Sequence, residues 1–225
     1  YILMCGTGVG FSVEESQVCK LPIVNEHFEE SPTVIHVADS RSGWARSFRE
    51  LISLLYAGQV PSIDVSSVRP AGVRLKTMGG RASGPEPLLE LFTFCIDVFK
   101  RASGRRLKAI ECHDIMCKIG EIVVVGGVRR SALISLSDLS DREMSHAKSG
   151  NWWENDGHRA LANNSVSYSK KPDIGTFLKE WLSLYDSKSG ERGIFNREAA
   201  KMKVAENGRR DAEHEFGCNP CSEII

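Results

Sequence analysis

Three residues near the end of the chain have side chains that together could do chemistry on a polyol. Asn219, Cys221 and Glu223 alternate within the stretch Phe216–Ile225. In an extended segment residues i, i+2 and i+4 point to one side, so the amide, thiol and carboxylate are expected to face one volume. The sulfur could carry an unpaired electron and take a hydrogen atom from carbon. The carboxylate could accept the neighbouring hydroxyl proton, and the amide could hold a second hydroxyl.

A simpler interpretation of the same stretch is a surface loop with an Asn-Pro turn and a buried thiol. Pro220 has no backbone donor, so the segment is expected to be a loop or a strand edge. Cys218 and Cys221 form a C-x-x-C pair, but a zinc site needs a second pair, and Cys112 and Cys117 lack the required spacing. No metal site is therefore predicted, and the seven cysteines do not indicate a disulfide framework.

Glycines mark two places where a ligand could approach the backbone. Gly8 and Gly10 alternate with Gly6, a pattern that lets a ligand or another strand come close. The G-K-[ST] ending of a Walker loop is absent. Residues 77–85 form a glycine-rich stretch that enters a helix, where unpartnered amides could bind an anion. The structural alternatives are a tight turn for the first stretch and a simply capped helix for the second.

Two adjacent arginines in a glycine-hinged loop give a further candidate site. Guanidinium groups suit phosphates or base edges, and the glycines permit movement, whereas a structural ion pair is the alternative interpretation. The candidate residues of this loop are Gly126, Gly127, Arg129, Arg130 and Ser131. Those of the preceding stretch are Gly79, Gly80, Ser83 and Gly84, with Ser83 as the predicted helix N-cap.

The elements that must position these residues alternate between strands and helices. Helices are predicted at 44–57, 86–102, 107–125, 173–185 and 197–206, and strands at 34–37, 63–68, 132–137, 162–168 and 194–196. This alternation favours an α/β fold with largely parallel strands. In the helix at 173–185 the apolar stripe, predicted to face inward, is Ile174, Phe177, Leu178, Trp181, Leu182 and Tyr185.

Histidines are not expected to contribute a site. His113 and Asp114 are neighbours on a predicted helix and should point apart, which argues against a catalytic dyad. His158 is isolated and is expected at the surface. Charge gives no sign of a nucleic-acid or membrane partner, because Lys and Arg number 29 and Asp and Glu also number 29. Apolar runs are too short to cross a bilayer, and no signal peptide is recognised.

Five stretches, in order, resemble the ribonucleotide reductases. The finger-loop motif of that family is similar to Asn219-Pro-Cys-Ser-Glu-Ile224. The other four stretches are Gly6–Val13, Arg69–Gly72 with Gly79–Pro85, Gly126–Ala132, and Ala162–Val166. They resemble most closely the adenosylcobalamin-dependent class and its monomeric triphosphate-reducing branch. The beginning at Tyr1, inside an apolar run, and the end just after the motif suggest an excised piece of a longer protein.

The resemblance implies a partial ten-stranded α/β barrel with a central finger loop. One catalytic domain is expected over 1–225, with the finger loop at 216–225 and effector or specificity loops at 77–85 and 126–131. The family pattern places Asn163 and Asn164 near the active site, and Gly8 and Gly10 beside the substrate floor.

The resemblance also implies a reaction. Cys221 would become a thiyl radical with the help of adenosylcobalamin, Glu223 would act as general base on the 3′-hydroxyl, and Asn219 would bind the sugar hydroxyls. The implied partners are a ribonucleoside triphosphate, a deoxynucleotide effector, and thioredoxin or a similar dithiol, in the cytoplasm. No nucleic acid or membrane partner is expected, and the product would be a DNA precursor.

Some family features have no counterpart in the chain. None of its cysteines matches the family's reducing pair, and most of the adenosylcobalamin site is expected outside it, so the fragment alone should be inactive. Two alternatives stay open. One is a large-subunit fragment of an aerobic two-subunit ribonucleoside-diphosphate reductase, which shares Asn-x-Cys-x-Glu. The other is a non-catalytic nucleotide-binding domain in which Arg129 and Arg130 bind the nucleotide and Cys221 merely packs.

Overall fold

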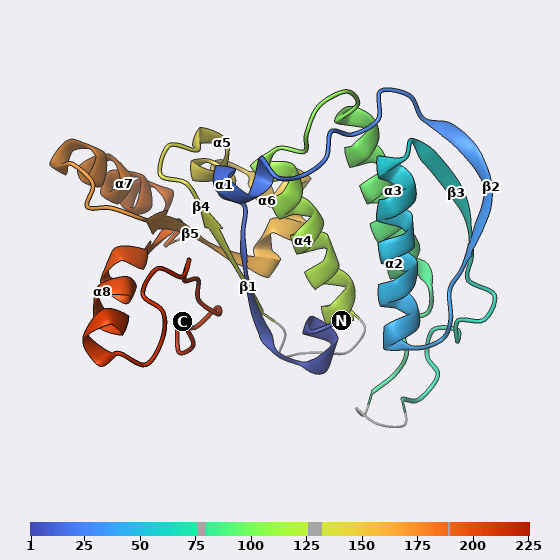
Figure 1. Cartoon of the computed structure of the whole chain (residues 1–225). Helices are drawn as coiled ribbons and strands as arrows, with labels where there is room; N and C mark the ends of the chain where they lie inside the picture. The colour runs from blue at the N-terminus through green and yellow to red at the C-terminus, as the bar shows by residue number, and fades with distance from the viewer. Residues whose placement is uncertain (76–79, 126–131, 189) are drawn as a thin grey trace.

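Two separate parallel sheets form the framework of the chain (Figure 1). The computed structural model describes residues 1–75, 80–125, 132–188 and 190–225. The larger sheet has the order β1-β4-β5-β6 and the smaller pairs β2 with β3. The strands are β1 (Gly8–Ser12), β2 (Glu29–His36), β3 (Gln59–Asp64), β4 (Ala132–Ser137), β5 (Ala162–Tyr168) and β6 (Gly193–Asn196).

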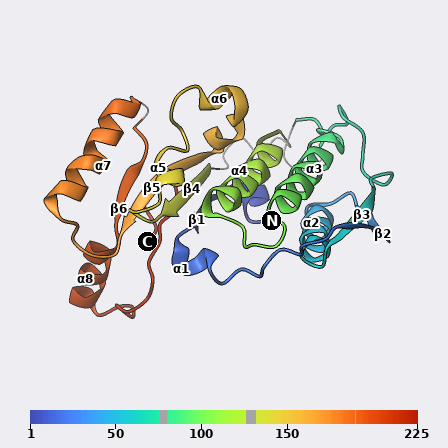
Figure 2. The ribbon, with the colours of Figure 1, turned by 90° about the horizontal axis from the view of Figure 1, so that it is seen from above.

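Helices connect the strands and cover both sheets (Figure 2). The longer helices are α2 (Arg41–Tyr56), α3 (Glu86–Arg101), α4 (Ala109–Val125), α7 (Ile174–Ser187) and α8 (Arg197–Asn207). The short ones are η1 (Leu3–Cys5), α1 (Glu15–Val18), α5 (Arg142–Ser145), α6 (Trp152–Asn155) and η2 (Gly157–Leu161). No helix in the described ranges combines the length and apolar character needed to cross a membrane.

The larger sheet brings together strands that are far apart in the chain. β1 pairs with β4, and the chain between them contains the whole smaller sheet with α2, α3 and α4. The register places Gly10, Ile134 and Asn163 in one row across three strands. Residues in such a row point to the same face of the sheet. That face is the one on which the C-terminal segment and α8 pack, whereas α4 covers the other.

The smaller sheet, α2, α3 and part of α4 share one apolar core at the opposite end of the molecule from α7 and α8 (Figures 1 and 2). Leu51, Leu55 and Phe92 are almost completely buried in it. Local signals define the ends of α2: the Ser40 side chain accepts a hydrogen bond from the Gly43 amide at 3.0 Å. Gly58 ends the helix with a φ of 77°, which a residue without Cβ adopts readily.

The predicted elements agree closely with the structure in type. The strands expected at 132–137, 162–168 and 194–196 form, and the predicted parallel arrangement is confirmed. The strand expected at 63–68 is misplaced, since β3 is Gln59–Asp64 and the chain then turns, with Ser66 donating to the Asp64 carboxylate at 2.9 Å.

The prediction that the apolar stripe of α7 faces inward is wrong for this chain. Ile174 is 79 % exposed and Tyr185 69 %, and none of the helix residues is buried. The helix begins where Asp173 accepts a hydrogen bond from the Thr176 amide at 3.0 Å. Amphipathic spacing predicted which residues share a face, but only packing partners can bury that face, and the described residues provide none there.

Candidate active site

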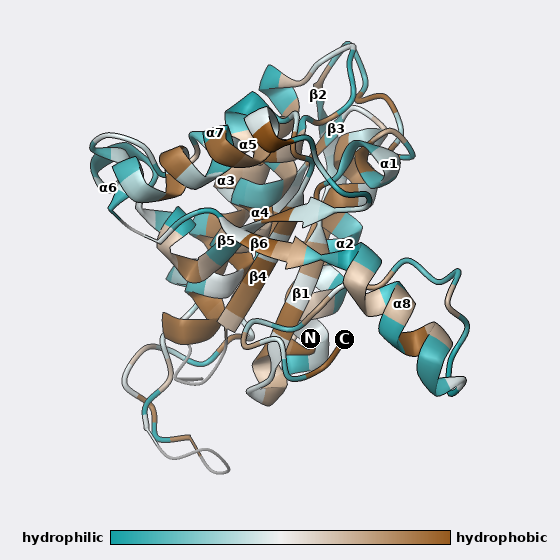
Figure 3. Ribbon diagram, turned by 90° about the vertical axis from the view of Figure 1, so that its left-hand side faces the viewer, coloured by the Kyte–Doolittle hydropathy of each residue, from teal (hydrophilic) through white to brown (hydrophobic). Residues whose placement is uncertain are grey.

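The C-terminal segment crosses the larger sheet over two glycines of β1, on the side of the molecule seen in Figure 3. A Cβ added to Gly10 would lie 1.9 Å from the Cys218 carbonyl oxygen, and one added to Gly8 would lie 2.8 Å from Pro220 Cδ. Any side chain at these positions would push the segment off the sheet. The alternating glycines therefore serve a close approach of backbone, which was one of the two predicted roles.

Arg197, the first residue of α8, ties the start of this segment to the end of β1. Its Nε donates to the Phe216 carbonyl oxygen at 2.7 Å. Its two terminal nitrogens donate to the two carboxylate oxygens of Glu14 at 2.8 and 2.7 Å. Glu14 is 4 % exposed and Arg197 7 %, so the pair is buried.

The ionisation of this pair follows from its partners. Burial alone would raise the pKa of Glu14, but hydrogen bonds from Arg197 and Ser12, together with the arginine charge, hold the pKa below its usual value. The hydrogen bonds to Glu14 raise the pKa of Arg197. Both groups are therefore charged at neutral pH, and each supplies the charge that the other requires when removed from water.

The tip of the finger loop (216–225) is a turn. The Ser222 amide donates to the Asn219 carbonyl oxygen at 2.9 Å, and Ser222 has a φ of 60°. Two further hydrogen bonds join Asn219 to Ile224. The Asn219 amide donates to the Ile224 carbonyl oxygen at 3.1 Å, and the Ile224 amide donates to Asn219 Oδ1 at 3.1 Å. The assumption of an extended 219–223 segment is therefore wrong, because the reversal starts at Asn219.

An alternating pattern of contacts does occur in the finger loop, but in the residues that precede the turn. Phe216, Cys218 and Pro220 make successive contacts with the sheet region, as every second residue of an extended segment does. Phe216 and Cys218 are 4 % and 6 % exposed and pack with Ile134 and Leu136. The segment that leads to the turn is thus fixed, and the turn projects from it.

The three predicted catalytic side chains lie at this turn with different accessibility. Cys221 and Glu223 are exposed and Asn219 is half-buried. The Asn219 Oδ1 accepts from the Ile224 amide, which leaves its NH₂ group to donate to a ligand. Cys221 is not packed into apolar surroundings, so its sulfur can be reached from outside the chain. The thiol, carboxylate and amide are close in sequence, and the turn rather than an extended strand determines how they face.

The asparagine pair of β5 divides between the two faces of the sheet. Asn163 is exposed and shares the row of Gly10, on the face crossed by the finger loop. Asn164 is 3 % exposed and points the other way, where its Oδ1 lies 2.8 Å from His113 Nε2. Asn163 therefore lies on the face of the sheet that the finger loop crosses, whereas Asn164 connects β5 to α4.

Two expectations about the surroundings of Asp114 are wrong: that His113 and Asp114 point apart, and that His158 lies at the surface. His113 Nδ1 lies 3.2 Å from Asp114 Oδ1, although the two are sequence neighbours. His158 is not a surface residue: its side chain is 10 % exposed, with Nε2 3.3 Å from Asp114 Oδ1. Arg159 completes the cluster with bonds of 2.7 and 2.8 Å to the two Asp114 oxygens. His158 and Arg159 belong to η2, so their contacts with Asp114 on α4 are created only by the fold.

The charge of this cluster is balanced internally. Burial alone would raise the pKa of Asp114, but Arg159, His113 and His158 outweigh it and hold the pKa well below its usual range. Asp114, Asp156 and His158 could converge on a cation, yet Arg159 already bonds both carboxylates. Burial raises the pKa of nearby Cys117 to about 12, so this thiol has no nucleophilic character.

Several predicted ligand residues lie outside the described residues. These are Gly79, Gly126, Gly127, Arg129, Arg130 and Ser131. In the described part of the same stretches, Gly80 and Gly84 have φ of 98° and 79°, as turns require. Ser83 is not the N-cap of α3, since its hydroxyl donates to the Gly84 carbonyl and Pro85 occupies the cap position.

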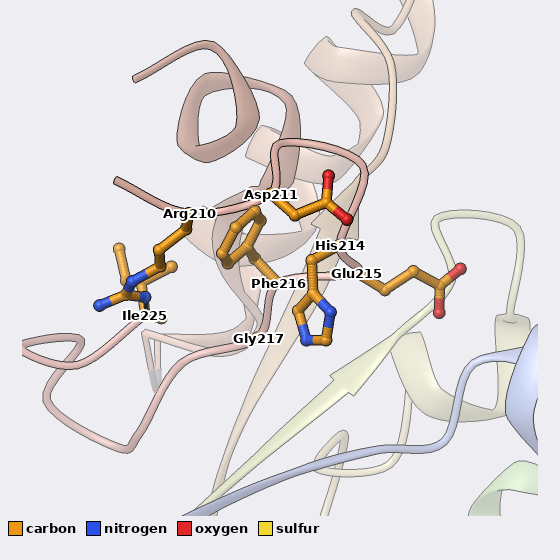
Figure 4. A pocket seen from close by; sticks show the side chains of 7 residues that line it. All are labelled: Arg210, Asp211, His214, Glu215, Phe216, Gly217 and Ile225. Carbon is orange, nitrogen blue, oxygen red and sulfur yellow. Dashed lines mark hydrogen bonds between the residues drawn. The ribbon is translucent and has the colours of Figure 1, made fainter. Parts of the chain in front are cut away.

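A pocket of about 370 Å³ opens beside the finger loop (Figure 4). It is lined by Arg210, Asp211, His214, Glu215, Phe216, Gly217 and Ile225. Arg210 bonds the Ile225 carbonyl, and the His214 ring meets the Phe216 ring edge-on at 5.6 Å. The pocket therefore depends on the finger-loop conformation and is part of the same site.

The sequence did not identify Glu14 and Arg197 as site residues. They are 183 positions apart, and each alone reads as an ordinary surface charge. The one local indication is that Arg197 directly follows β6 and Glu14 follows β1, and the ends of parallel strands meet at one edge of a sheet.

Comparisons with known proteins give a consistent picture. Residues 13–99 match the family model described as the insertion domain of B12-dependent ribonucleotide reductase. These residues lie between β1 and α4 and include the smaller sheet. The expected single barrel domain over 1–225 did not set these residues apart as an inserted unit.

Relatives cover almost the whole chain. The adenosylcobalamin-dependent ribonucleoside-triphosphate reductase of Lacticaseibacillus paracasei is 31 % identical over 99 % of the chain, and that of Lactobacillus leichmannii is 29 % identical. The chain spans about a third of these relatives, 34 % in both cases. A solved B12-dependent (class II) ribonucleotide reductase matches the structure with a TM-score of 0.65 and 28 % identity, over 74 % of this chain and 27 % of that one.

Proposed function

The chain is a relative, in sequence and fold, of part of the B12-dependent ribonucleotide reductases, and from this premise we propose that it supplies the radical-carrying finger loop of such an enzyme. The complete reaction would convert ribonucleoside triphosphates to deoxyribonucleoside triphosphates in the cytoplasm, with thioredoxin or a similar dithiol as reductant. The observation that carries the proposal is the exposed Cys221, at the tip of a loop anchored on the sheet.

The proposed roles follow from what each group at the turn can do. The Cys221 sulfur takes the hydrogen atom from the 3′ carbon of the ribose. Glu223 accepts the proton of the 3′-hydroxyl, and the Asn219 NH₂ donates to a sugar hydroxyl. Asn163, exposed in the row of Gly10, provides a further amide on the same face of the sheet. Loss of the 2′-hydroxyl as water leaves an oxidised sugar radical, which the dithiol reduces by two electrons and two protons as it becomes a disulfide. Return of the hydrogen atom from Cys221 to the 3′ carbon then gives the deoxynucleotide and restores the thiyl radical.

Adenosylcobalamin, when bound, would supply the oxidant that removes the hydrogen atom of the Cys221 thiol. The described residues fit this requirement in one respect, since Cys221 is exposed rather than packed. The groups that hold the cofactor would come mainly from outside these 225 residues. What this chain contributes is the sulfur, the fixed loop on which it stands, and the base and amide beside it.

We further propose that loops 77–85 and 126–131 respond to a deoxynucleotide effector. The second loop joins α4 to β4, and Ala132 directly after it pairs with Gly8. Gly8 is the residue on which Pro220 rests. A ligand that changed the entry into β4 would therefore act close to the base of the finger loop, which gives coupling a short physical route.

A substitution at Cys221 tests the proposed chemistry against a purely nucleotide-binding role. In the complete reductase polypeptide carrying this chain, Cys221→Ser should lower adenosylcobalamin-dependent deoxynucleotide formation by at least about a thousandfold, because the reactive sulfur is lost. Nucleotide binding should be unchanged. The matched control is Cys19→Ser, another exposed cysteine, which should keep full activity. Equal activity of Cys221→Ser and Cys19→Ser would refute the radical role.

A further inference from the structure

We infer that Arg197 is a positioning residue for the finger loop, and that together with Glu14 it determines where Cys221 stands relative to the sheet. Arg197 acts through the backbone, because its Nε holds the Phe216 carbonyl five residues before Cys221. For the reaction itself the inference rests on the proposed function, whereas the anchoring can be measured without it.

The guanidinium connects three parts of the structure at once. It bonds Glu14 after β1, the Phe216 carbonyl at the start of the finger loop, and Ser169 Oγ after β5 at 3.2 Å. A planar fork with donors on three nitrogens can satisfy these acceptors together, whereas a lysine ammonium donates from a single point. The orientation of Arg197 is in turn fixed by α8, of which it is the first residue.

Glu14 is held just as firmly. Its Oε2 accepts from the Ser12 hydroxyl at 2.8 Å, and the Val13 amide beside it donates to the Leu136 carbonyl at 2.8 Å. A second contact supports the same approach, since Gln17 Nε2 donates to Glu215 Oε2 at 2.9 Å. The position of the guanidinium is therefore set by the larger sheet itself.

The main effect of the Glu14–Arg197 pair is to fix the position of the finger loop, and its contribution to the stability of the fold is secondary. A buried ion pair is often replaceable by apolar residues of the same volume without loss of stability. Its hydrogen bonds, however, fix Phe216 to one position, and Gly10 and Gly8 then accept Cys218 and Pro220 against β1. A loop fixed at three alternate residues can present the following turn in one place, and small displacements of a reacting group cost large factors in rate.

Cysteine labelling in the chain itself tests the anchoring. Native alkylation, read at each cysteine by peptide mass spectrometry, should be slow at Cys218 in the wild type because this residue is 6 % exposed. In Arg197→Gln the alkylation rate of Cys218 should rise about a hundredfold. Loss of one partner of a buried ion pair lowers the free energy needed to open this segment locally, and alkylation of a buried cysteine requires such an opening. Cys95 and Cys117, both fully buried elsewhere, should stay protected.

Arg192 provides the matched control. It is 4 % exposed, pairs with Glu180 at 3.0 Å, and donates to the Asp138 carbonyl at 2.8 Å. Within the part of the chain that the structure describes, its hydrogen bonds go to Glu180, Ser137, Asp138 and Leu139, and none goes to the finger loop. Arg192→Gln should leave the Cys218 rate close to that of the wild type. If Arg197→Gln does not fold, Arg197→Lys keeps the charge beside Glu14 without the Nε bond and should give a smaller increase at Cys218.

Two labelling results would overturn the inference. One is an unchanged Cys218 rate in a folded Arg197 variant. The other is a parallel rise at Cys95, Cys117 and Cys218, which would mean that Arg197 only stabilises the whole fold. In the complete reductase Arg197→Lys should lower kcat while KM for the nucleotide stays unchanged. A wild-type polypeptide without reductase activity would instead reject the proposed function and leave the labelling result standing.

Discussion

The two ends of the molecule are held together by different kinds of interaction. Around the smaller sheet, residues such as Leu51, Leu55 and Phe92 form a continuous apolar core. Around the larger sheet the apolar cluster under the finger loop is small. Ion pairs and side-chain hydrogen bonds hold many of the segments together there. Among the described residues, every buried polar or charged side chain except Ser47 belongs to the larger sheet or to segments that pack on it.

This difference has a physical meaning. Apolar contacts are not directional, so a core such as the one around Phe92 tolerates small shifts of its elements. Hydrogen-bonded pairs such as Glu14 with Arg197 and His113 with Asn164 hold their partners in one geometry. Directional hydrogen bonds and ion pairs thus hold the region that is proposed to carry the radical chemistry. The region that matches the insertion domain is held mainly by non-directional apolar packing.

The largest expected effect comes from breaking the apolar end. Phe92→Ala removes a side chain that is 1 % exposed and should lower the free energy of unfolding by about 4 kcal/mol, through lost burial and a residual cavity. Urea denaturation measures this change. If the two ends differ as described, Cys218 should keep its protection from alkylation under native conditions. Increased labelling of Cys218 without global unfolding would show that the two ends are not independent.

A smaller effect with a distinctive pH dependence is expected at the polar end. Glu14→Gln leaves Arg197 buried without its counter-charge and should cost about 3 kcal/mol at pH 7. Because the folded-state pKa of Glu14 is lowered from 4.5, its contribution is complete above that value and is lost as the pH falls through the lower folded pKa. Urea titrations of the wild type and variant at several pH values measure the difference.

The control for that experiment is an exposed pair. Arg69 Nε and Asp39 Oδ2 are 2.8 Å apart, but both side chains are exposed to solvent, Arg69 by 37 % and Asp39 by 34 %. Asp39→Asn should therefore change the unfolding free energy by less than about 1 kcal/mol. The difference in unfolding free energy between the wild type and Glu14→Gln should shrink as the pH falls. A difference that stays constant down to pH 2 would contradict the assignment of a charged, paired Glu14.

The smallest effect sharpens the comparison at the loop itself. Gly10→Ala forces a methyl group against the Cys218 carbonyl and should cost about 2 kcal/mol, with faster labelling of Cys218 as the loop moves. Gly157→Ala is the matched control, because a Cβ there would meet nothing within 4 Å. Equal stability and equal Cys218 labelling in the two variants would show that the loop does not rest on β1 as described.

The sequence by itself determined most of the elements and indicated where to look for a site. Period-2 and period-3.6 patterns, the Ser40 cap and Gly58 are local signals, and local signals suffice for a helix or a strand. Five short stretches in order were enough to indicate the family. The alternation of Gly8 and Gly10 correctly predicted a close backbone approach, although not which segment would make it.

Only the tertiary structure decided which residues meet. The pairing of Glu14 with Arg197 and the contacts of Asp114 with His158 and Arg159 join positions far apart in the chain, where no periodicity carries information. Period 2 alone places Asn163 and Asn164 on opposite faces of β5, but what each face meets is decided by the elements packed on it. The same reason explains the apolar stripe of α7, which amphipathic spacing predicted to be buried. Spacing determines which side chains share a face, but what covers that face depends on the elements that fold against it.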